Sequence, residues 1–228
     1  MATIGEMAAG VAHELNQPLT AIANYAQACD RLLARPDTDP LELQQALREI
    51  AAQATRAGEI IRRLRSLARS QQSARVPADL NGVVGEVSDL ILSEARLHGV
   101  LVSMELAENL PPVLVDAGQI QHVMLNFVRN SLEALAAGPA AAGRLQIRTS
   151  LTAENEVELA IIDNGPGLAP EVVQRIFDPF FSTKESGTGL GLAISNTIAR
   201  AHGGSVGYRP NLSAGACFYI LLPAQPRS

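Results

Sequence analysis

The sequence predicts an α+β protein of two domains, an antiparallel helical hairpin followed by an α/β sandwich. Up to residue 69, apolar side chains recur at spacings of three and four, which is typical of helices. After residue 77, helical patterns alternate with strand patterns. The residues between lose both patterns and read as a linker, so we expect domains at 1–75 and 76–228.

The first expected helix covers residues 4 to 33. Its apolar residues lie on one side: Ile4, Met7, Val11, Pro18, Ile22, Tyr25, Cys29 and Leu32. Pro18 should bend this helix, because proline lacks a backbone donor and clashes with the carbonyl four residues earlier. A turn over residues 35–40 follows, with Asp39 as a candidate cap and Pro40 at the first position of a second helix.

The second expected helix places apolar and small residues at heptad spacing: Leu47, Ile50, Ala54, Ala57, Ile61, Leu64 and Ala68. The short connection makes the two helices antiparallel neighbours. Two helices alone bury a poor core. We therefore expect a homodimer in which two hairpins close a four-helix bundle.

The second domain is expected to alternate helices and strands. We predict helices near 79–98, 117–136 and 188–202, and strands near 100–106, 112–115, 144–151, 156–163, 204–209 and 216–222. The segment 164–187 is long, punctuated by Gly and Pro, and only briefly helical. Long loops of this kind often serve as lids.

Composition excludes several functions. The net charge of −5, an aromatic content of 4% and the lack of Trp give little support for a nucleic-acid surface. Cys29 and Cys217 are far apart, which predicts neither a disulfide framework nor a zinc site and fits a reducing, cytoplasmic location. The chain lacks both a signal peptide pattern and an apolar run of about 20 residues, so we expect no membrane insertion.

His13 is a candidate nucleophile. It lies two residues past Val11, which turns it about 200° away from the apolar side and toward solvent. A neutral imidazole can attack an electrophile, and Glu14 could accept the proton of its second nitrogen. Taken alone, a His-Glu pair is more often a solvated surface feature.

Three further motifs follow in the second domain. Asn126 and Asn130 lie four residues apart on one side of a helix, and an amide oxygen can bind Mg²⁺ beside a triphosphate, although a pair of Asn is more often structural. Asp163-Asn-Gly-Pro-Gly167 ends a strand. Its carboxylate could accept the adenine amine while Gly165 and Gly167 admit the ring, or the segment could be a plain turn.

The third motif is Phe177-Asp-Pro-Phe-Phe-Ser-Thr-Lys184, followed by Gly187-Thr-Gly-Leu-Gly191 at a helix start. Backbone N–H groups at such a start bind phosphates, and Lys184 could reach the terminal one. The glycine spacing differs from the dinucleotide-binding fingerprint. The aromatic residues could equally form a local core cluster.

The order and spacing of these motifs resemble the sensor histidine kinases of two-component signalling. The segment from His13 to Leu19 looks like their phosphoacceptor box, and the later motifs look like their N, G1, F and G2 boxes. The box sequence is most similar to the oxygen- and nitrogen-regulating subgroup. The resemblance implies a dimerisation and phosphotransfer hairpin joined to a GHKL-type ATP-binding domain of the Bergerat fold.

The resemblance also implies roles for single residues. His13 would take the γ-phosphoryl group of ATP with help from Glu14, Asn130 would bind Mg²⁺, and Asp163 would read adenine. The nucleotide site would comprise Asn126, Asn130, Asp163, Gly165, Gly167, Phe180, Lys184, Gly187, Thr188, Gly189, Leu190 and Gly191. A response-regulator receiver domain would then accept the phosphoryl group on an aspartate.

Three features depart from the family pattern. Gln17 stands where many members place Thr or Asn to orient water for phosphatase activity, and Gln could still serve there. Ala216 replaces a Thr often found near adenine. Only twelve residues precede His13, so we expect the sensor domain to lie outside this chain.

Two alternatives remain. Gyrase-like and chaperone ATPase clamps share the nucleotide fold but carry Glu at the position of Asn126, which argues against rapid hydrolysis here. A silent dimeric scaffold would need none of the motif residues. We assign His98, His122 and His202 to surface or packing roles, and the Arg-rich stretch of residues 62–75 to a solvated helix side.

Overall fold

The structure is a computed structural model that describes residues 4–35, 39–69, 75–137, 142–184, 189–211 and 215–226; the side chains of residues 4–14, 59, 60, 62–69 and 137 lie outside the description. The chain divides into two compact units, Met1–Ala68 and Arg69–Ser228. The domain bounds 1–75 and 76–228 themselves stay a prediction.

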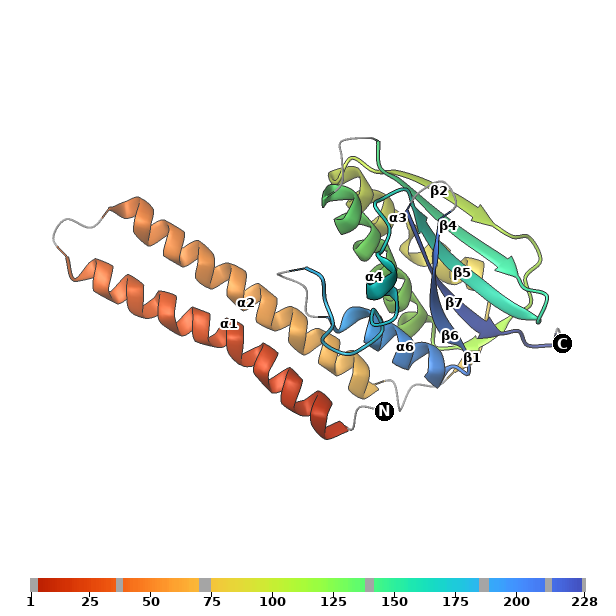
Figure 1. Cartoon of the computed structure of the whole chain (residues 1–228), viewed down its shortest axis with the longest axis horizontal. Coiled ribbons are helices and arrows are strands. Elements are labelled where there is room, and N and C mark those ends of the chain that lie inside the picture. Colours follow the sequence, from red (N-terminus) through yellow and green to blue (C-terminus); the bar gives the residue numbers. More distant parts are fainter. Residues whose placement is uncertain are drawn as a thin grey trace. The chain divides into compact units, whose positions relative to one another are not determined.

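The first unit is a helical hairpin. Helices α1 (Ile4–Leu33) and α2 (Pro40–Arg69) run antiparallel (Figure 1). The predicted start of α2 is confirmed, because the Leu41 N–H donates to the Asp39 carboxylate over 2.9 Å. Helix α1 continues through Pro18. Cys29, Ala46 and Ala57 are buried, whereas several large apolar side chains are exposed: Leu19, Tyr25, Leu47 and Ile61.

The second unit contains a five-stranded sheet. Its strands are β2 (Leu101–Leu106), β4 (Arg144–Leu151), β5 (Glu156–Asp163), β7 (Ala216–Pro223) and β6 (Ser205–Pro210), in that spatial order. Strands β2 and β4 are parallel, and the other neighbours are antiparallel. Strands β1 (Val76–Ala78) and β3 (Val113–Val115) form a separate antiparallel pair.

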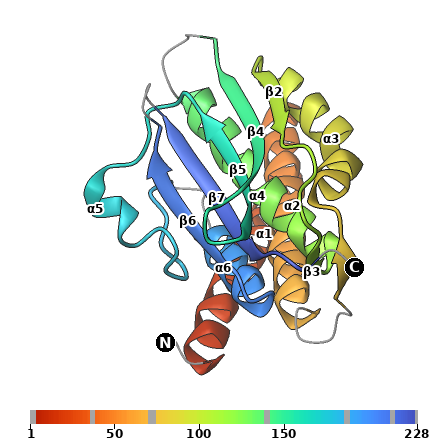
Figure 2. The ribbon, with the colours of Figure 1, turned by 90° about the vertical axis from the view of Figure 1, so that its right-hand side faces the viewer.

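Helices cover one side of this sheet. Helix α3 (Leu80–Leu97) packs on β2, α4 (Ala117–Ala137) on β5, and α6 (Gly191–Ala201) on β6 and β7 (Figure 2). Residues 157–161 of β5 are all buried, so both sides of this central strand are covered. The rings of Phe127 on α4 and Phe218 on β7 stack 5.7 Å apart. The core therefore lies between α4 and the central strands.

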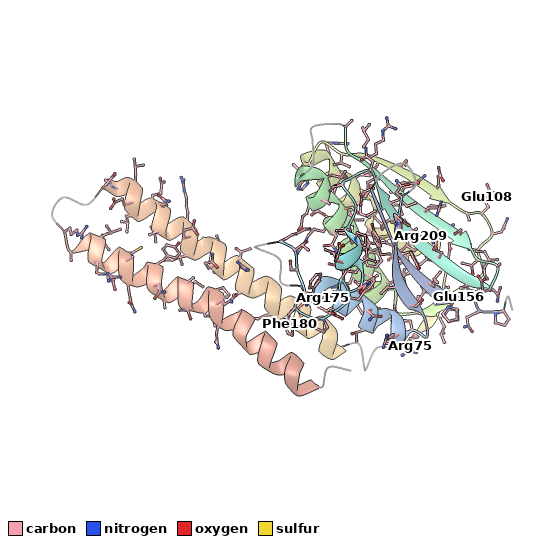
Figure 3. The ribbon with its side chains drawn as sticks, viewed as in Figure 1. Arg75, Glu108, Glu156, Arg175, Phe180 and Arg209 are labelled. Carbon is pink, nitrogen blue, oxygen red and sulfur yellow. The ribbon has the colours of Figure 1, made fainter. Side chains whose placement is uncertain are left out.

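The opposite side of the sheet holds a charged cluster. Glu158 on β5 is buried and accepts two hydrogen bonds from the Arg209 guanidinium, at 2.6 and 2.9 Å. Arg209 lies on β6 (Figure 3), over the Tyr219 ring, and the hydrogen bond to Glu158 holds its pKa above the usual value. Burial also raises the pKa of the neighbouring Cys217 thiol. The cluster satisfies a carboxylate that would otherwise be buried alone.

Most predicted elements are confirmed, with two corrections. Strand β1 was missed because it has only three residues, one of them Pro77, and takes its order from pairing with β3. The last helix begins at Gly191 rather than near 188, because Gly189 has a φ of +64° and Leu190 is the N-cap. The segment 164–184 contains one short helix, α5 (Pro170–Val173).

None of the helices in the described ranges is both long enough and apolar enough to cross a membrane.

Candidate active site

Asp163 lies at the end of β5, with its side chain 2% exposed. Its Oδ2 accepts a hydrogen bond from the Ser131 hydroxyl of α4 at 2.7 Å. Its Oδ1 accepts from the backbone N–H groups of Gly165 at 2.9 Å and Ala216 at 3.1 Å. A carboxylate can accept about four hydrogen bonds. The three hydrogen bonds from Ser131, Gly165 and Ala216 therefore leave one lone pair on Oδ2 for an external donor.

The loop after Asp163 is held by residues that follow much later in the chain. The Leu168 N–H donates to the Tyr208 hydroxyl over 3.2 Å, and the Asn211 amide donates to the Asp163 carbonyl over 3.0 Å. Gly167 has a φ of +71°, which suits glycine. Ser131, Tyr208 and Asn211 were not predicted from the sequence, because none lies at a spacing that links it to Asp163.

Asn126 connects α4 to the start of α6. Its Nδ2 donates to the Ser195 hydroxyl over 3.0 Å, and that hydroxyl donates to the Gly191 carbonyl over 3.1 Å. A Cβ atom at Gly191 would lie 2.3 Å from the Asn126 Oδ1. Glycine at this position is therefore needed for close packing of the two helices, independently of any bound ligand.

Asn130 lies one turn further along α4 and is half-buried. Among the described residues, none forms a hydrogen bond with its carboxamide. Asn126 and Asn130 project from the same side of the helix, as predicted from their spacing. The amide oxygen of Asn130 is thus available to an external ligand.

The segment before α6 closes back on itself. Phe180 has a φ of +67°, rare for a residue with a side chain, and its N–H donates to the Gly189 carbonyl over 3.2 Å. A Cβ atom at Gly189 would lie 2.4 Å from the Phe180 carbonyl carbon. The Arg175 guanidinium lies 4.4 Å from the centre of the Phe181 ring. Figure 3 labels Arg175 and Phe180 in this segment. Gly189 therefore serves local packing as well as any phosphate contact.

Lys184 forms an ion pair that its sequence position did not predict. Its Nζ lies 2.5 Å from Oε2 of Glu133, on α4. The other oxygen, Oε1, lies 3.4 Å from Nε of Arg129. One carboxylate thus joins two cations, three residues beyond Asn130. The signal was the i,i+4 spacing of Arg129 and Glu133, but nothing in the sequence linked that pair to Lys184.

The remaining predicted residues are less fully described. His13 and Glu14 belong to the continuous backbone of α1, but their side chains lie outside the described set, so the predicted exposure of His13 stays a prediction. Gln17 is exposed on the same helix. Gly187 and Thr188 lie outside the described residues.

His202 has a packing role that its sequence position did not reveal in detail. It is 6% exposed and ends α6. Its Nδ1 lies 2.7 Å from the Ile198 carbonyl, and its Nε2 accepts the Asp116 N–H over 3.1 Å. Asp116 in turn caps the first turn of α4. His202 therefore ties the end of α6 to the start of α4, the two helices that carry the candidate site.

A two-layer domain combines a buried carboxylate at the end of a central strand with an amide oxygen and a lysine ammonium on or beside α4. These features define a nucleotide-binding class of protein. Two family models make the class specific. Residues 115–226 match the family described as histidine kinase-, DNA gyrase B-, and HSP90-like ATPase, and residues 3–73 match the His kinase A (phospho-acceptor) domain. The chain belongs to the two-component histidine kinases and forms their catalytic core.

Individual relatives agree with this assignment. Sensor protein FixL of Bradyrhizobium diazoefficiens is 40% identical over 98% of this chain and 44% of its own length. The signal transduction histidine-protein kinase AtoS of Escherichia coli is 34% identical over 100% of this chain and 36% of its own length. The chain thus spans less than half the length of these curated relatives.

Solved structures confirm the predicted fold class. Histidine kinase ThkA in complex with response regulator protein TrrA aligns with a TM-score of 0.70 and 25% identity, over 98% of this chain and 62% of that one. Full-length ShkA in complex with AMPPNP aligns with a TM-score of 0.66 and 25% identity, over 93% of this chain and 47% of that one. The hairpin and the GHKL-type sandwich are therefore both those of histidine kinases.

Proposed function

We propose that this chain transfers the γ-phosphoryl group of ATP to His13, and from there to an aspartate in the receiver domain of a response regulator. The observation that carries the proposal is the Asp163 network, a buried carboxylate with one lone pair still available. Such a group can accept the exocyclic amine of adenine and exclude bases that lack it. The second unit would then bind ATP and the hairpin would receive its phosphoryl group.

The phosphate end of ATP would lie along α4. The free amide oxygen of Asn130 is a hard neutral ligand, which fits a Mg²⁺ ion shared with the phosphates. Mg²⁺, when bound, would neutralise part of the phosphate charge. Lys184 would bind the terminal phosphate, and Asn126 would keep α6 beside α4. The backbone of residues 187–191 would donate N–H groups. Phe180 would shape the segment that carries Lys184.

The transfer itself requires an unprotonated imidazole nitrogen on His13. That nitrogen forms a bond to the γ-phosphorus while the bond from phosphorus to the β,γ-bridging oxygen breaks, so ADP leaves with the electron pair. Glu14, next in the chain, would accept the proton of the other ring nitrogen. Gln17 lies one turn beyond His13 and is the candidate for orienting water in a dephosphorylation of the response regulator.

The proposal includes a homodimer. Leu19, Tyr25, Leu47 and Ile61 are exposed on the hairpin, and a second hairpin would cover apolar side chains of this kind in a four-helix bundle. The family match of residues 3–73 supports the dimer, and the similarity to ThkA in complex with response regulator protein TrrA supports the receiver partner. A cytoplasmic location completes the proposal.

Incubation with γ-labelled ATP and Mg²⁺ tests the assignment. Wild type should retain label that survives alkali and is lost in acid, as expected of phosphohistidine. His13→Ala and Asn130→Ala should both lose it. His98→Ala is the matched control, because His98 is exposed at the end of α3 and should leave labelling unchanged.

The same labelled protein, mixed with a receiver domain and with its Asp→Ala variant, tests the second transfer. Label should move only to the receiver that keeps its aspartate. Label on His13→Ala would show that another residue is the acceptor. Free phosphate without labelled protein would favour an ATPase. The absence of both free phosphate and labelled protein would favour a scaffold. Sedimentation of the unlabelled chain measures the dimer.

A further inference from the structure

Glu133 lies on the side of α4 that carries the candidate site. It follows Asn126 by seven residues, and a helix turns about 100° per residue, so the two side chains leave α4 within about 20° of each other. Asn130 lies between them on the same side. Glu133 is thus placed at the end of the site where the phosphates are expected.

The contacts of Glu133 place a negative charge where it competes with phosphate. Its two carboxylate oxygens separately bind Lys184 at 2.5 Å and Arg129 at 3.4 Å. The Lys184 contact joins segments 51 residues apart and is not a local helix pair. Lys184 is also the residue assigned to the terminal phosphate. Its ammonium therefore has two possible anionic partners, the carboxylate and the nucleotide.

Lys184 and Glu133 can each replace the other by water or by another ion. The side chains of Lys184 and Glu133 are 40% and 42% exposed, so water can replace either contact at little cost. A triphosphate carries more negative charge than one carboxylate and offers more acceptor oxygens. The phosphate should consequently win the competition for Lys184 when nucleotide is present.

We propose that Glu133 is a positioning residue that holds Lys184 at the phosphate end of the site before nucleotide binds and yields it to the terminal phosphate of ATP. This inference rests on the proposed function and deepens it. Glu133 has two opposing effects. It keeps the ammonium close to the site, and it makes ATP compete for that ammonium. Arg129, on the other oxygen, keeps the carboxylate from being left unpaired when Lys184 departs.

Calorimetric titration with Mg·ATP and with AMP tests the competition, because AMP lacks the terminal phosphates. The proteins are wild type, Glu133→Gln, Lys184→Met and the double variant. Glu133→Gln removes the competing charge while keeping the side chain's size. The matched control is Glu86→Gln, since Glu86 is an exposed carboxylate on α3 that accepts a hydrogen bond from Gln121 on α4.

Glu133→Gln should bind Mg·ATP about two- to fivefold more tightly than wild type, the range expected for losing one exposed ion pair. AMP affinity and the Glu86→Gln control should be unchanged. Most of the gain should disappear in the Lys184→Met background, and it should shrink at high salt. In autophosphorylation, KM for ATP should fall with little change in kcat.

Unchanged or weaker ATP binding by Glu133→Gln would overturn the inference. So would an equal gain with and without Lys184, because that result would reflect general repulsion of phosphate by Glu133. Binding of ATP without labelling of His13 would overturn the proposed phosphotransfer. The comparison of Mg·ATP affinities would still test the role of Glu133. A wild-type chain that binds no ATP would overturn both.

Discussion

Replacing Ser131 with alanine tests how the Asp163 carboxylate is held. The substitution removes one hydroxyl from a fully buried position and leaves the backbone donors of Gly165 and Ala216 in place. The lost hydrogen bond is 2.7 Å long and ends on a buried carboxylate. Hydrogen bonds to charged groups contribute about 1.5–3 kcal/mol, and we expect Ser131→Ala to lower the unfolding free energy by that amount.

Calorimetric melting measures this cost. For a unit of this size, each 1 kcal/mol lowers the melting temperature by about 2–4 °C, so the transition of the second unit should fall by about 3–12 °C. ATP affinity should also fall, because the free lone pair of Asp163 is less firmly oriented. Ser88→Ala is the control. The Ser88 hydroxyl donates an exposed hydrogen bond to the Gly85 carbonyl of α3, so its loss should cost no more than about 0.5 kcal/mol.

Equal melting of Ser131→Ala and Ser88→Ala would refute this reasoning, because it would show that the Ser131 hydroxyl adds no net stability. Normal ATP affinity in a destabilised Ser131→Ala chain would refute only the link from this hydroxyl to the nucleotide.

Two further predictions concern single positions. Gly189→Ala should destabilise the second unit and weaken ATP binding, because the new Cβ would lie 2.4 Å from the Phe180 carbonyl carbon at a φ of +64°. The control Gly85→Ala, in open space on α3, should stabilise the unit by about 0.5–1 kcal/mol. Denaturant melts that give the two variants the same stability would contradict this geometry. Burial lowers the pKa of His122 from 6.5, so the unfolded chain binds a proton more readily than the folded one, and stability should fall as pH drops below about 6.5. His122→Gln should reduce the dependence of stability on pH below about pH 6.5. An unchanged slope would show that other groups cause this pH dependence.

The elements of this fold could be predicted because each carries its own periodicity. The alternating apolar residues Val157, Leu159 and Ile161 predicted a strand ending at Asp163, and the structure confirms this strand. The Asp39 cap and Pro40 likewise predicted the start of α2. In each case the information lies within a few consecutive residues, where backbone geometry directly relates side-chain type to position.

The partners of Asp163 could not be predicted in the same way. Ser131 precedes it by 32 residues, and Ala216 follows by 53. Their approach depends on how α4 packs on β5 and on the pairing of β5 with β7, and such register comes from the assembled sheet. Strand β1 was missed because three residues have no periodicity of their own and its order depends on pairing with β3.

Gly189 and Gly191 show how one motif can satisfy two physical requirements. Their spacing before a helix predicted phosphate binding through backbone N–H groups. The structure adds that Gly191 is needed for α6 to pack against Asn126, and Gly189 for the chain to pass Phe180. Substituting either glycine would therefore disturb packing and nucleotide together. The ion pair of Lys184 with Glu133 is exposed and lies outside that packing, so charge changes there separate recognition of phosphate from the integrity of the fold.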